Sequence, residues 1–522
     1  MRFPKLSIII AGTLLASLLV GPGLPLRAHA GSTTTVSVLT QHNNTDRTGV
    51  NPNETILNTS NVNTNSFGLL FKLYVNGQIY AQPLYVPNMT IAGAVHNVVF
   101  VATMHNYVYA FDADTPGPPL WRTNQLGTPI PLANNQQGIP ANQQIGWACG
   151  SGTYTDIVGA VGIVSTPVID PASNTMYLIA TNKDGDGSFH HRLHALDLAT
   201  GQDKLTPRDI QASYPGNGAD SVIGQVPFDN QTELQRAGLL LSHGTIYAAF
   251  AGYCDTPPYH GWVLGFNATD LSLNSAFNDT PNGGSPTGFD GAGIWQSGLG
   301  PAADADGNVY VGTGNGLSDA INGKADYGDS YLKLSPTLQL TDWFMPYNVQ
   351  TLDNNDLDIS SSGAVLIPNS NYFFGGGKEG KLYLLNRGAL GHFTADSTAQ
   401  AQAVQSFQVT RNDDGIVRNI HGGPVFWQEP TSAYAYVWGE QDSFKAFRFD
   451  YNTNRFDTTP ASQSTMLDPT GCGGVCMPVR RSRSRPMAAR RAAASSGRRC
   501  RSPETRPTMS SPASCARSTR RT

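Results

Sequence analysis

Apolar and polar positions alternate along this chain in short runs, and the clearest run is residues 373–387, FFGGGKEGKLYLLNR. From Leu382 to Leu385, successive side chains point to opposite faces, with the period of two that is typical of a β-strand. The residues Lys378-Glu379-Gly380 separate this strand from a glycine-rich first strand. The pattern predicts a β-hairpin, which cannot bury enough apolar surface to be stable alone.

The same order of strand types recurs six times along the chain. A first strand with a small residue or proline before aliphatic residues is predicted at 82–86, 165–169, 236–241, 300–302, 362–366 and 423–427. A second strand rich in Val, Tyr and Phe is predicted at 97–103, 174–181, 244–250, 307–313, 371–377 and 433–439. A third strand is predicted at 107–113, 192–198, 262–268, 331–337, 381–387 and 444–450.

Each unit is a small antiparallel sheet that cannot cover both of its faces by itself. Stacking the units face to face in a ring buries these faces. The repeats therefore predict an all-β protein, a β-propeller of four-stranded antiparallel blades around a central channel. Six blades are legible, and an intact relative would have seven or eight. A β-sandwich does not explain the repeated order of strands. We expect the propeller to cover 71–478, after an extended entry segment at 31–70.

The N-terminus has the pattern of a signal peptide over residues 1–30. Arg2 and Lys5 precede an apolar run from Leu6 to Val20, and Ala28-His29-Ala30 provides a small-residue cleavage site. The alternative is an uncleaved anchor, but the run is short for a membrane span of about 20 residues. We expect a secreted or periplasmic protein with no transmembrane span after cleavage.

The C-terminal stretch 479–522 differs from the rest of the chain. It contains thirteen arginines, no lysine and one acid, Glu504. One interpretation is a disordered basic tail that binds nucleic acid, and the other is translation in the wrong reading frame. With GC-rich codons chosen for Ser502–Arg517, a shift by one base can yield SGDATNDVVPGILRA, which has ordinary strand and turn residues. We favour a frameshift, which would remove a seventh blade.

The charge of the body becomes clear once both ends are set aside. Arg2, Lys5 and Arg27 lie in the signal, so 18 of the 34 basic residues and 37 of the 38 acidic residues belong to the body, a net charge of about −19. An acidic body argues against nucleic acid as a partner.

Six cysteines leave the disulfide pattern open. Cys149 and Cys254 can bridge two loops, and Cys472 and Cys476 can close a small one. The chain has no Cys-x-x-Cys-His motif, so covalent haem attachment is not indicated.

The third-strand sequences VYAFDADT at Val108 and LHALDLATG at Leu193 resemble the pyrroloquinoline-quinone (PQQ) repeat. Over Val38–Gly474 the chain is similar to the secreted quinoprotein-like β-propeller family. The resemblance implies PQQ held over the central channel beside Ca²⁺, with an acid or histidine that takes the proton of the substrate. The Cys-Cys pair of the alcohol-oxidising branch is absent here.

Two residues are candidate catalytic bases because they precede first strands, near the mouth of a propeller channel. Asp358 lies in LDNNDLDISSSG before the fifth unit, and His421 precedes Gly422-Gly423-Pro424 in the sixth. The alternatives are turn or cap chemistry for Asp358 and packing against the next blade for His421.

Four further residues are candidate ligands. Lys378 and Arg387 could bind the carboxylates of an anionic cofactor, although a lysine at a tight turn is more often solvated. Asp184 and Asp186, in KDGDGS, resemble part of a calcium loop, and the alternative is an Asp/Gly hairpin turn.

Two functions remain open from the sequence. The first is a PQQ-dependent dehydrogenase of an alcohol or a sugar, with calcium as a second cofactor. The second is a non-catalytic propeller that binds a protein or a glycan on the face where its longer loops gather.

Overall fold

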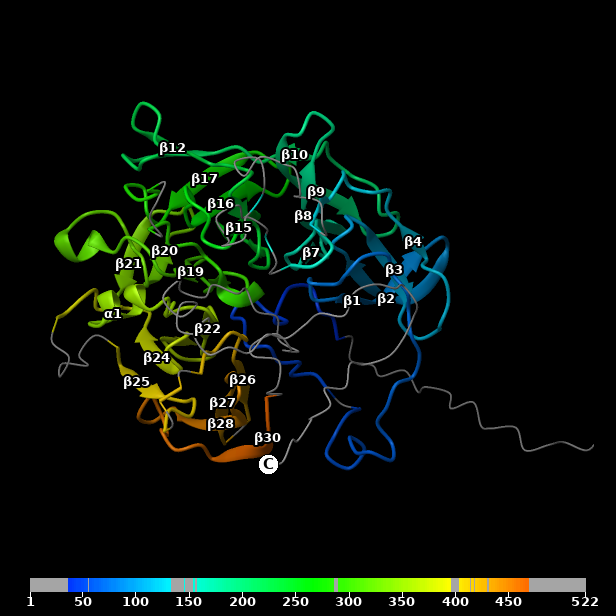
Figure 1. Ribbon diagram of the computed structural model, residues 1–522. Helices are drawn as coiled ribbons and strands as arrows, with labels where there is room; N and C mark the ends of the chain where they lie inside the picture. The colour runs from blue at the N-terminus through cyan, green and yellow to red at the C-terminus, as the bar shows by residue number, and fades with distance from the viewer. Residues whose placement is uncertain are drawn as a thin grey trace, which may run out of the picture.

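The computed structural model describes residues 36–54, 56–132, 145, 154, 157–285, 290–395, 403–413, 415–416, 418–429 and 431–468. Within these residues, six sheets of four or five antiparallel strands are arranged around a central axis (Figure 1). The predicted β-propeller of four-stranded antiparallel blades is therefore confirmed.

The blades follow one another in chain order. Blade 1 consists of β1 (Leu84–Ile91), β2 (Ala94–Ala102), β3 (Val108–Asp112) and β4 (Trp121–Arg122). Blade 2 consists of β7 (Val168–Asp170), β8 (Thr175–Lys183), β9 (Phe189–Asp197) and β10 (Arg208–Asp209). Blade 3 consists of β13 (Glu233–Leu234), β14 (Leu240–Ser242), β15 (Thr245–Gly252), β16 (Trp262–Asn267) and β17 (Leu273–Asn278).

The second half of the ring repeats this arrangement. Blade 4 consists of β18 (Ala302–Ala303), β19 (Val309–Gly312), β20 (Tyr331–Leu334) and β21 (Leu340–Phe344). Blade 5 consists of β22 (Ala364–Leu366), β23 (Tyr372–Gly376), β24 (Lys381–Asn386) and β25 (Gln405–Gln408). Blade 6 consists of β26 (Val425–Gln428), β27 (Ala433–Trp438), β28 (Ser443–Asp450), β29 (Arg455–Phe456) and β30 (Ser462–Leu467).

Short elements lie between the blades. They are the strand pairs β5 (Ile130–Pro131) with β6 (Ala160–Val161) and β11 (Ser213–Pro215) with β12 (Gln225–Pro227), and the helix α1 (Val349–Asn354).

The alternation predicted for the 373–387 hairpin divides its side chains between two neighbouring blades. Leu382 and Leu384 join a buried cluster with blade 6, whereas Tyr383 and Leu385 join another with blade 4. The hairpin is stable because both of its faces are covered, which a lone ribbon cannot achieve.

The predicted entry segment fills the centre of the ring over Val38–Gly49. Its backbone bonds to the first strands of five blades, through the pairs Val38–Tyr85, Leu39–Ile169, Thr45–Ala303, Asp46–Leu366 and Thr48–Phe426, at 2.8–3.0 Å. In blade 3, the hydroxyl of Thr40 donates to the carbonyl oxygen of Leu239, the residue before β14. The first strand of each blade therefore lines the axis, and the N-terminal segment occupies it.

Arg47 holds this central segment in place and is fully buried. Its Nε donates to the carbonyl oxygen of Pro301 at 2.9 Å, and one Nη donates to that of Leu239 at 3.2 Å. The other Nη donates to the carbonyl oxygen of Gln41 at 2.7 Å. Burial lowers the pKa of Arg47 to about 9.

The two faces of the ring carry different connections. Because the strands are antiparallel, the chain enters each first strand on the same face where it turns from the second strand to the third. We call this the entry face. Residues that precede first strands and residues in second-to-third turns therefore gather on the entry face.

Several predicted features lie outside the described residues. They are the signal peptide at 1–30, the tail at 479–522, Cys149, Cys472 and Cys476. Cys254 is disulfide-bonded. In the described part of the chain, no helix is long and apolar enough to cross a membrane.

Candidate functional site

A buried cluster of acidic residues surrounds Lys378 on the entry face. Lys378 is 4% exposed, and its Nζ lies 2.6 Å from Oδ2 of Asp358 and also contacts Asp356. Burial opposes the charged lysine, but the two carboxylates outweigh it and raise its pKa. The alternative that Lys378 is solvated, as is usual for a lysine at a tight turn, is thus wrong, since Lys378 lies inside the protein.

The glycines before Lys378 allow this arrangement. The backbone N–H of Lys378 donates to the carbonyl oxygen of Asp358 at 2.9 Å. A Cβ at Gly377 would collide with the carbonyl oxygens of Asp358 and Ile359. The glycine-rich strand therefore lets the hairpin turn approach the entry to β22 closely enough for the ion pair to form.

The other oxygen of Asp358 faces blade 4. Its Oδ1 accepts a hydrogen bond from the backbone N–H of Asn315 at 2.8 Å. The Asn315 side chain donates to Oδ2 of Asp329 at 2.9 Å, and its own Oδ1 is buried without a hydrogen-bond partner. Asn315 thus links two carboxylates and presents an unused oxygen between blades 4 and 5.

The electrostatics of the cluster are those of crowded, buried acids. Burial, followed by the charge of Asp358, raises the pKa of Asp329 well above its usual range. Burial also raises the pKa of Asp356 to about 7 and that of Asp353 to about 6. The described surroundings therefore leave an excess of acidic groups that an added cation would relieve.

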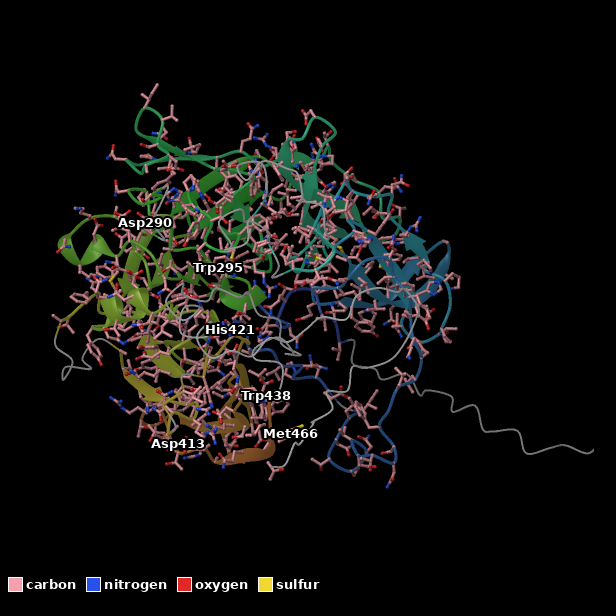
Figure 2. The ribbon with its side chains drawn as sticks, in the orientation of Figure 1. Asp290, Trp295, Asp413, His421, Trp438 and Met466 are labelled. Atoms are coloured by element: carbon pink, nitrogen blue, oxygen red, sulfur yellow. The ribbon has the colours of Figure 1, made fainter. Side chains whose placement is uncertain are left out.

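An aromatic side chain adjoins the cluster. A Cβ at Gly314 would lie 2.6 Å from Oδ1 of Asp358 and 3.0 Å from Cδ1 of Trp295, so this glycine separates the two side chains. Trp295 is 9% exposed and packs on its other side against Ala251 and Tyr253 of blade 3. In Figure 2, Trp295 and His421 both lie near the centre of the ring.

His421 forms a second buried pair close to the cluster. Its Nδ1 lies 2.7 Å from Oε1 of Glu440, and its Nε2 is buried without a hydrogen-bond partner. The preceding residue, Ile420, donates its N–H to the carbonyl oxygen of Gly377 at 3.1 Å. Gly377, the residue after β23, therefore lies between the backbones of Asp358 and Ile420, next to both predicted bases.

Arg387 does not belong to this cluster. It follows β24, whose six residues span about 20 Å, and so it lies on the face opposite the entry face. Its guanidinium bonds to the carbonyl oxygen of Ser370. One small ligand cannot contact both Lys378 and Arg387, which corrects the idea that they bind one cofactor together.

Asp184 and Asp186 belong to an ion-paired hairpin turn on the entry face of blade 2. Asp184 receives two hydrogen bonds from Arg192, at 2.9 and 2.6 Å. Asp186 accepts from the N–H and hydroxyl of Ser188. Within the described residues no three His, Cys, Asp or Glu side chains are grouped to hold a metal ion. The geometry is that of the alternative, an Asp/Gly turn.

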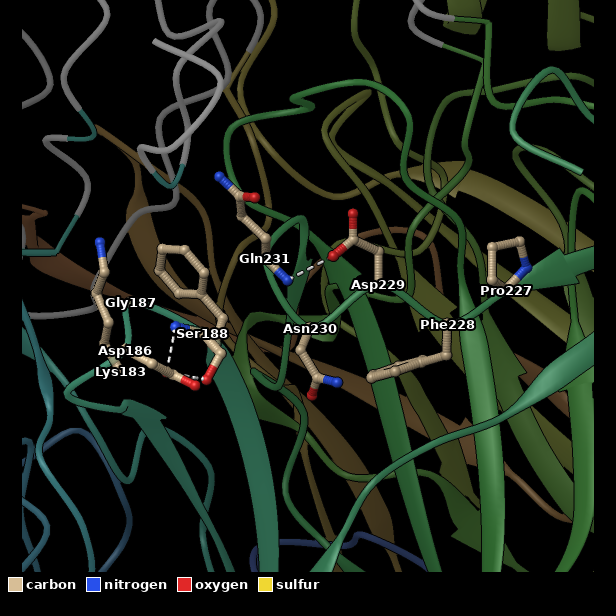
Figure 3. A pocket seen from close by; sticks show the side chains of 10 residues that line it. Lys183, Asp186, Gly187, Ser188, Pro227, Phe228, Asp229, Asn230 and Gln231 are labelled. Atoms are coloured by element: carbon tan, nitrogen blue, oxygen red, sulfur yellow. Dashed lines mark hydrogen bonds between the residues drawn. The ribbon is translucent and has the colours of Figure 1, made fainter. Parts of the chain in front are cut away.

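A hollow of about 640 Å³ lies beside this turn, lined by Lys183, Asp186–Phe189 and residues 227–231 (Figure 3). Asp186 turns back to Ser188, and Asp229 accepts from the backbone N–H of Gln231 at 2.8 Å. The carboxylates of Asp186 and Asp229, which line the hollow, are thus hydrogen-bonded within their own turns. The cluster around Lys378 contains a buried amide oxygen without a hydrogen-bond partner and carboxyl groups whose pKa values burial raises, so we regard it as the better candidate for chemistry.

Sequence reasoning found Asp358, Lys378 and His421 but missed Asn315, Asp329 and Trp295. Asn315 and Asp329 lie in the long connection between β19 and β20, where pattern alone assigns no role. The signal that could have found Asn315 is its position between Gly314 and Gly316, both of which contact neighbouring chain closely.

Comparisons with known proteins find likeness only among solved structures of low sequence identity. No family model and no curated protein matches the chain. Among solved structures it is similar to the quinohemoprotein alcohol dehydrogenases of Pseudomonas putida (13% identity, TM-score 0.47) and Comamonas testosteroni (15% identity, TM-score 0.47). Each alignment covers 81% of this chain and 60% of the other, so the chain spans about 60% of their length.

A europium-containing methanol dehydrogenase is similar at 14% identity and a TM-score of 0.48, over 82% of this chain and 78% of that one. At TM-scores below 0.5 these likenesses carry no argument about this chain, and unrelated activities occur on one fold in any case. The propeller is therefore assigned from its own sheets, and the function must be argued from its own residues.

Proposed function

We propose that this protein is an extracytoplasmic, quinoprotein-like β-propeller that oxidises an alcohol or a sugar with PQQ and Ca²⁺ bound at the entry face. The observation that carries the proposal is the buried, unpartnered Oδ1 of Asn315 beside the carboxylates of Asp358 and Asp329. The location outside the cytoplasm rests on the predicted signal peptide.

The site offers part of the ligand set of a hard cation, because among the described residues no three His, Cys, Asp or Glu side chains are grouped to hold a metal by themselves. Calcium takes carboxylate and amide oxygens as ligands, and these three side chains offer both kinds. Their number is below the six to eight ligands that Ca²⁺ requires, so a bound cofactor or water would supply the rest. A cation would also neutralise the acids whose pKa values burial has raised.

The same site has groups suited to an anionic aromatic cofactor. Trp295 offers an aromatic ring beside Asp358, and Lys378 is the positive charge of the cluster. PQQ, when bound, supplies the acceptor for the hydride of the substrate. The protein supplies orientation, a fixed field and a base.

His421 is suited to be that base. When Nδ1 donates its proton to Glu440, the neutral ring keeps a lone pair on Nε2, the atom without a partner. Asp358 is the second candidate, but its two oxygens already accept from Lys378 and Asn315. We assign proton removal to His421 and cation binding to Asp358.

The test uses the purified protein with added PQQ and CaCl₂. We expect saturable PQQ binding by equilibrium dialysis, a calcium-dependent rise in Tm, and dye reduction with alcohols or sugars. Asp358→Asn and Asn315→Ala should lose the calcium-dependent rise, whereas Asp186→Asn should keep it. Absence of PQQ binding to a folded protein overturns the proposal.

A second function is favoured by the hollow in Figure 3. Its polar lining on the entry face suits a protein or glycan ligand bound without catalysis. A glycan array probed with the same protein distinguishes the two, because Asp229→Ala should weaken glycan binding and leave PQQ binding unchanged.

A further inference from the structure

Blade 6 carries a hollow that the proposed chemistry does not use. Its volume is about 450 Å³, which is within the size range of small-molecule sites. Its lining consists of residues 49–51, Val425, Trp427, Glu429 and Tyr436. β26 runs away from the entry face and ends just before Glu429, so the acidic end of the hollow is remote from the cluster around Lys378. A ligand bound here is therefore independent of that cluster.

Strand register places the aromatic residues of the hollow on one face of blade 6. Val425 pairs with Tyr436 and Trp427 pairs with Tyr434, so these four side chains point the same way. The alternate residues of the two strands, such as Phe426, pack against blade 5. The aromatic face therefore lies on the side of β26 and β27 that is turned away from blade 5 (Figure 1).

The two aromatic rings of the hollow stand apart from each other. Trp427 and Tyr436 are diagonal neighbours across β26 and β27, with their Cα atoms about 7–8 Å apart. Within the described residues, the ring of Tyr436 contacts those of Tyr434 at 6.3 Å and Phe444 at 5.7 Å, but not that of Trp427. Tyr434 and Phe444 thus hold Tyr436 in place, while the space between Tyr436 and Trp427 stays open.

The chain that leaves the central axis forms another wall. Gly49 has a φ of +74°, and a Cβ at this position would lie 3.0 Å from Cγ2 of Val425. Glycine accepts this conformation and lets the chain pass close to β26. Val50 and Asn51 are thereby brought to the hollow.

A single carboxylate supplies the charge of the lining. Glu429 is exposed in the turn between β26 and β27, and its Oε2 accepts a hydrogen bond from the hydroxyl of Ser432 at 2.8 Å. Its Oε1 accepts none from a described residue. Burial, followed by the charge of Glu429, raises the pKa of Tyr436, so this carboxylate is close enough to act on the ring.

No lysine or arginine of the described chain fills the hollow. Two such side chains lie over aromatic rings, at Tyr107 and Phe189, and neither ring belongs to this lining. Arg448 of β28 pairs with Tyr434, but its guanidinium lies 3.9 Å from Oδ2 of Asp457. The rings and the carboxylate of the hollow thus have no positive partner within the described residues.

We propose that this hollow binds a quaternary or methylated ammonium cation of the size of choline. Aromatic faces beside a carboxylate attract an organic cation. The net charge of about −19 on the body of the chain raises the local concentration of cations. A trimethylammonium group has no N–H and needs no hydrogen-bond acceptor, whereas a primary ammonium has three N–H groups to satisfy in a lining that is mainly apolar and aromatic.

Isothermal titration calorimetry with choline chloride tests the site. The matched probe is dimethylbutanol, the uncharged carbon isostere of choline. We expect saturable binding of choline and at least about tenfold weaker binding of the isostere, because the rings and Glu429 act on the charge. Butylammonium should also bind more weakly than choline, since its N–H groups lose water. Equal affinities for choline and its isostere overturn the proposal, as does tighter binding of butylammonium.

Substitutions show whether the cation binds in this hollow. Trp427→Leu keeps an apolar side chain but removes the aromatic face, so choline binding should weaken at least about tenfold, and Trp427→Phe should restore part of it. Glu429→Gln removes the charge at an exposed position that the fold does not need, so it should weaken the binding of choline about fivefold and leave that of the isostere unchanged.

Asp457→Asn is the control, because it removes an exposed charge of the same blade outside the hollow, and it should change neither affinity. If Trp427→Leu and Glu429→Gln bind choline like the wild type, the proposal is wrong.

Choline is also the headgroup of a lipid, so a second measurement identifies the source of the cation. Co-sedimentation with phosphatidylcholine vesicles that free choline blocks would assign a lipid, and choline binding without co-sedimentation would assign a free cation. Both results require the ammonium site, and binding to neither probe overturns it.

Discussion

Nζ of Lys378 lies 2.6 Å from Oδ2 of Asp358, and both side chains are at least nine-tenths buried. The pair joins the turn between β23 and β24 to the segment that enters β22, so it holds these two parts of blade 5 together on the entry face. Removing two charges from water is costly, and such a pair persists only when further hydrogen bonds satisfy its remaining atoms. The N–H of Asn315 supplies one of these bonds to Asp358.

Replacing Lys378 by methionine should therefore destabilise the fold strongly. Lys378→Met leaves Asp356 and Asp358 buried without their cation, a change that costs about 3–5 kcal/mol. Chemical unfolding followed by tryptophan fluorescence measures it. The control is Lys381→Met, which removes a lysine that is 27% exposed and paired with Glu379, and it should cost less than about 1 kcal/mol. Equal losses in the two variants contradict the assignment.

Gly377 should not tolerate a side chain. Gly377→Ala places a Cβ against the carbonyl oxygens of Asp358 and Ile359, so the hairpin must move away from the entry of β22. Overpacking of this kind costs about 1–3 kcal/mol, and here it should also weaken the calcium binding that we propose. Gly117→Ala, where a Cβ meets nothing within 4 Å, is the control, and Tm measured with and without CaCl₂ is the readout. A Gly377→Ala protein with normal Tm and calcium response would argue against close packing at this turn.

More of the fold than of the candidate site could be predicted from the sequence. Period-two alternation repeated six times specifies blades, because each face of a sheet must be covered by its neighbour, and Leu382 and Tyr383 pack on the blades that this requires. The path of Val38–Gly49 along the axis could not be predicted, since its polar residues bond through backbone atoms that carry no sequence signal.

The same limit applies to the candidate site. Asp358 and His421 were found because they precede first strands, which is a topological property. Asn315 and Asp329 lie within a connection of eighteen residues between β19 and β20, whose path depends on contacts with blade 5. Nothing in the sequence indicates that a lysine at a turn is buried, so the environment of Lys378 could be seen only in the structure.

Arg47 should be the most sensitive residue of the central segment. Arg47→Met removes the donors to the carbonyl oxygens of Pro301 and Leu239 in the middle of the ring. Each buried acceptor left unsatisfied costs about 1–3 kcal/mol, so a loss of about 3–5 kcal/mol is expected. Thermal unfolding of Arg47→Met and Arg122→Met, an exposed arginine on β4, measures the difference. The central role is wrong if both variants unfold at the wild-type temperature.

Asp326 should make the folded protein less stable as the pH rises, which is the opposite of acid denaturation. It is fully buried, both of its oxygens accept from Asn282, at 2.8 and 2.9 Å, and burial, together with the hydrogen bond and charge of the neighbouring Asp319, raises its pKa from 3.8 to about 6. The folded protein thus keeps a proton that the unfolded chain releases, so this contribution is complete below about pH 4 and is lost as pH rises through about 6. Asp326→Asn cannot titrate, so the Tm of the variant minus that of wild type should increase between pH 4 and pH 7 and remain constant from pH 8 to pH 9. Differential scanning calorimetry in matched buffers measures this difference, and a value that is flat or falls over pH 4–7 would show that Asp326 is ionised in the fold.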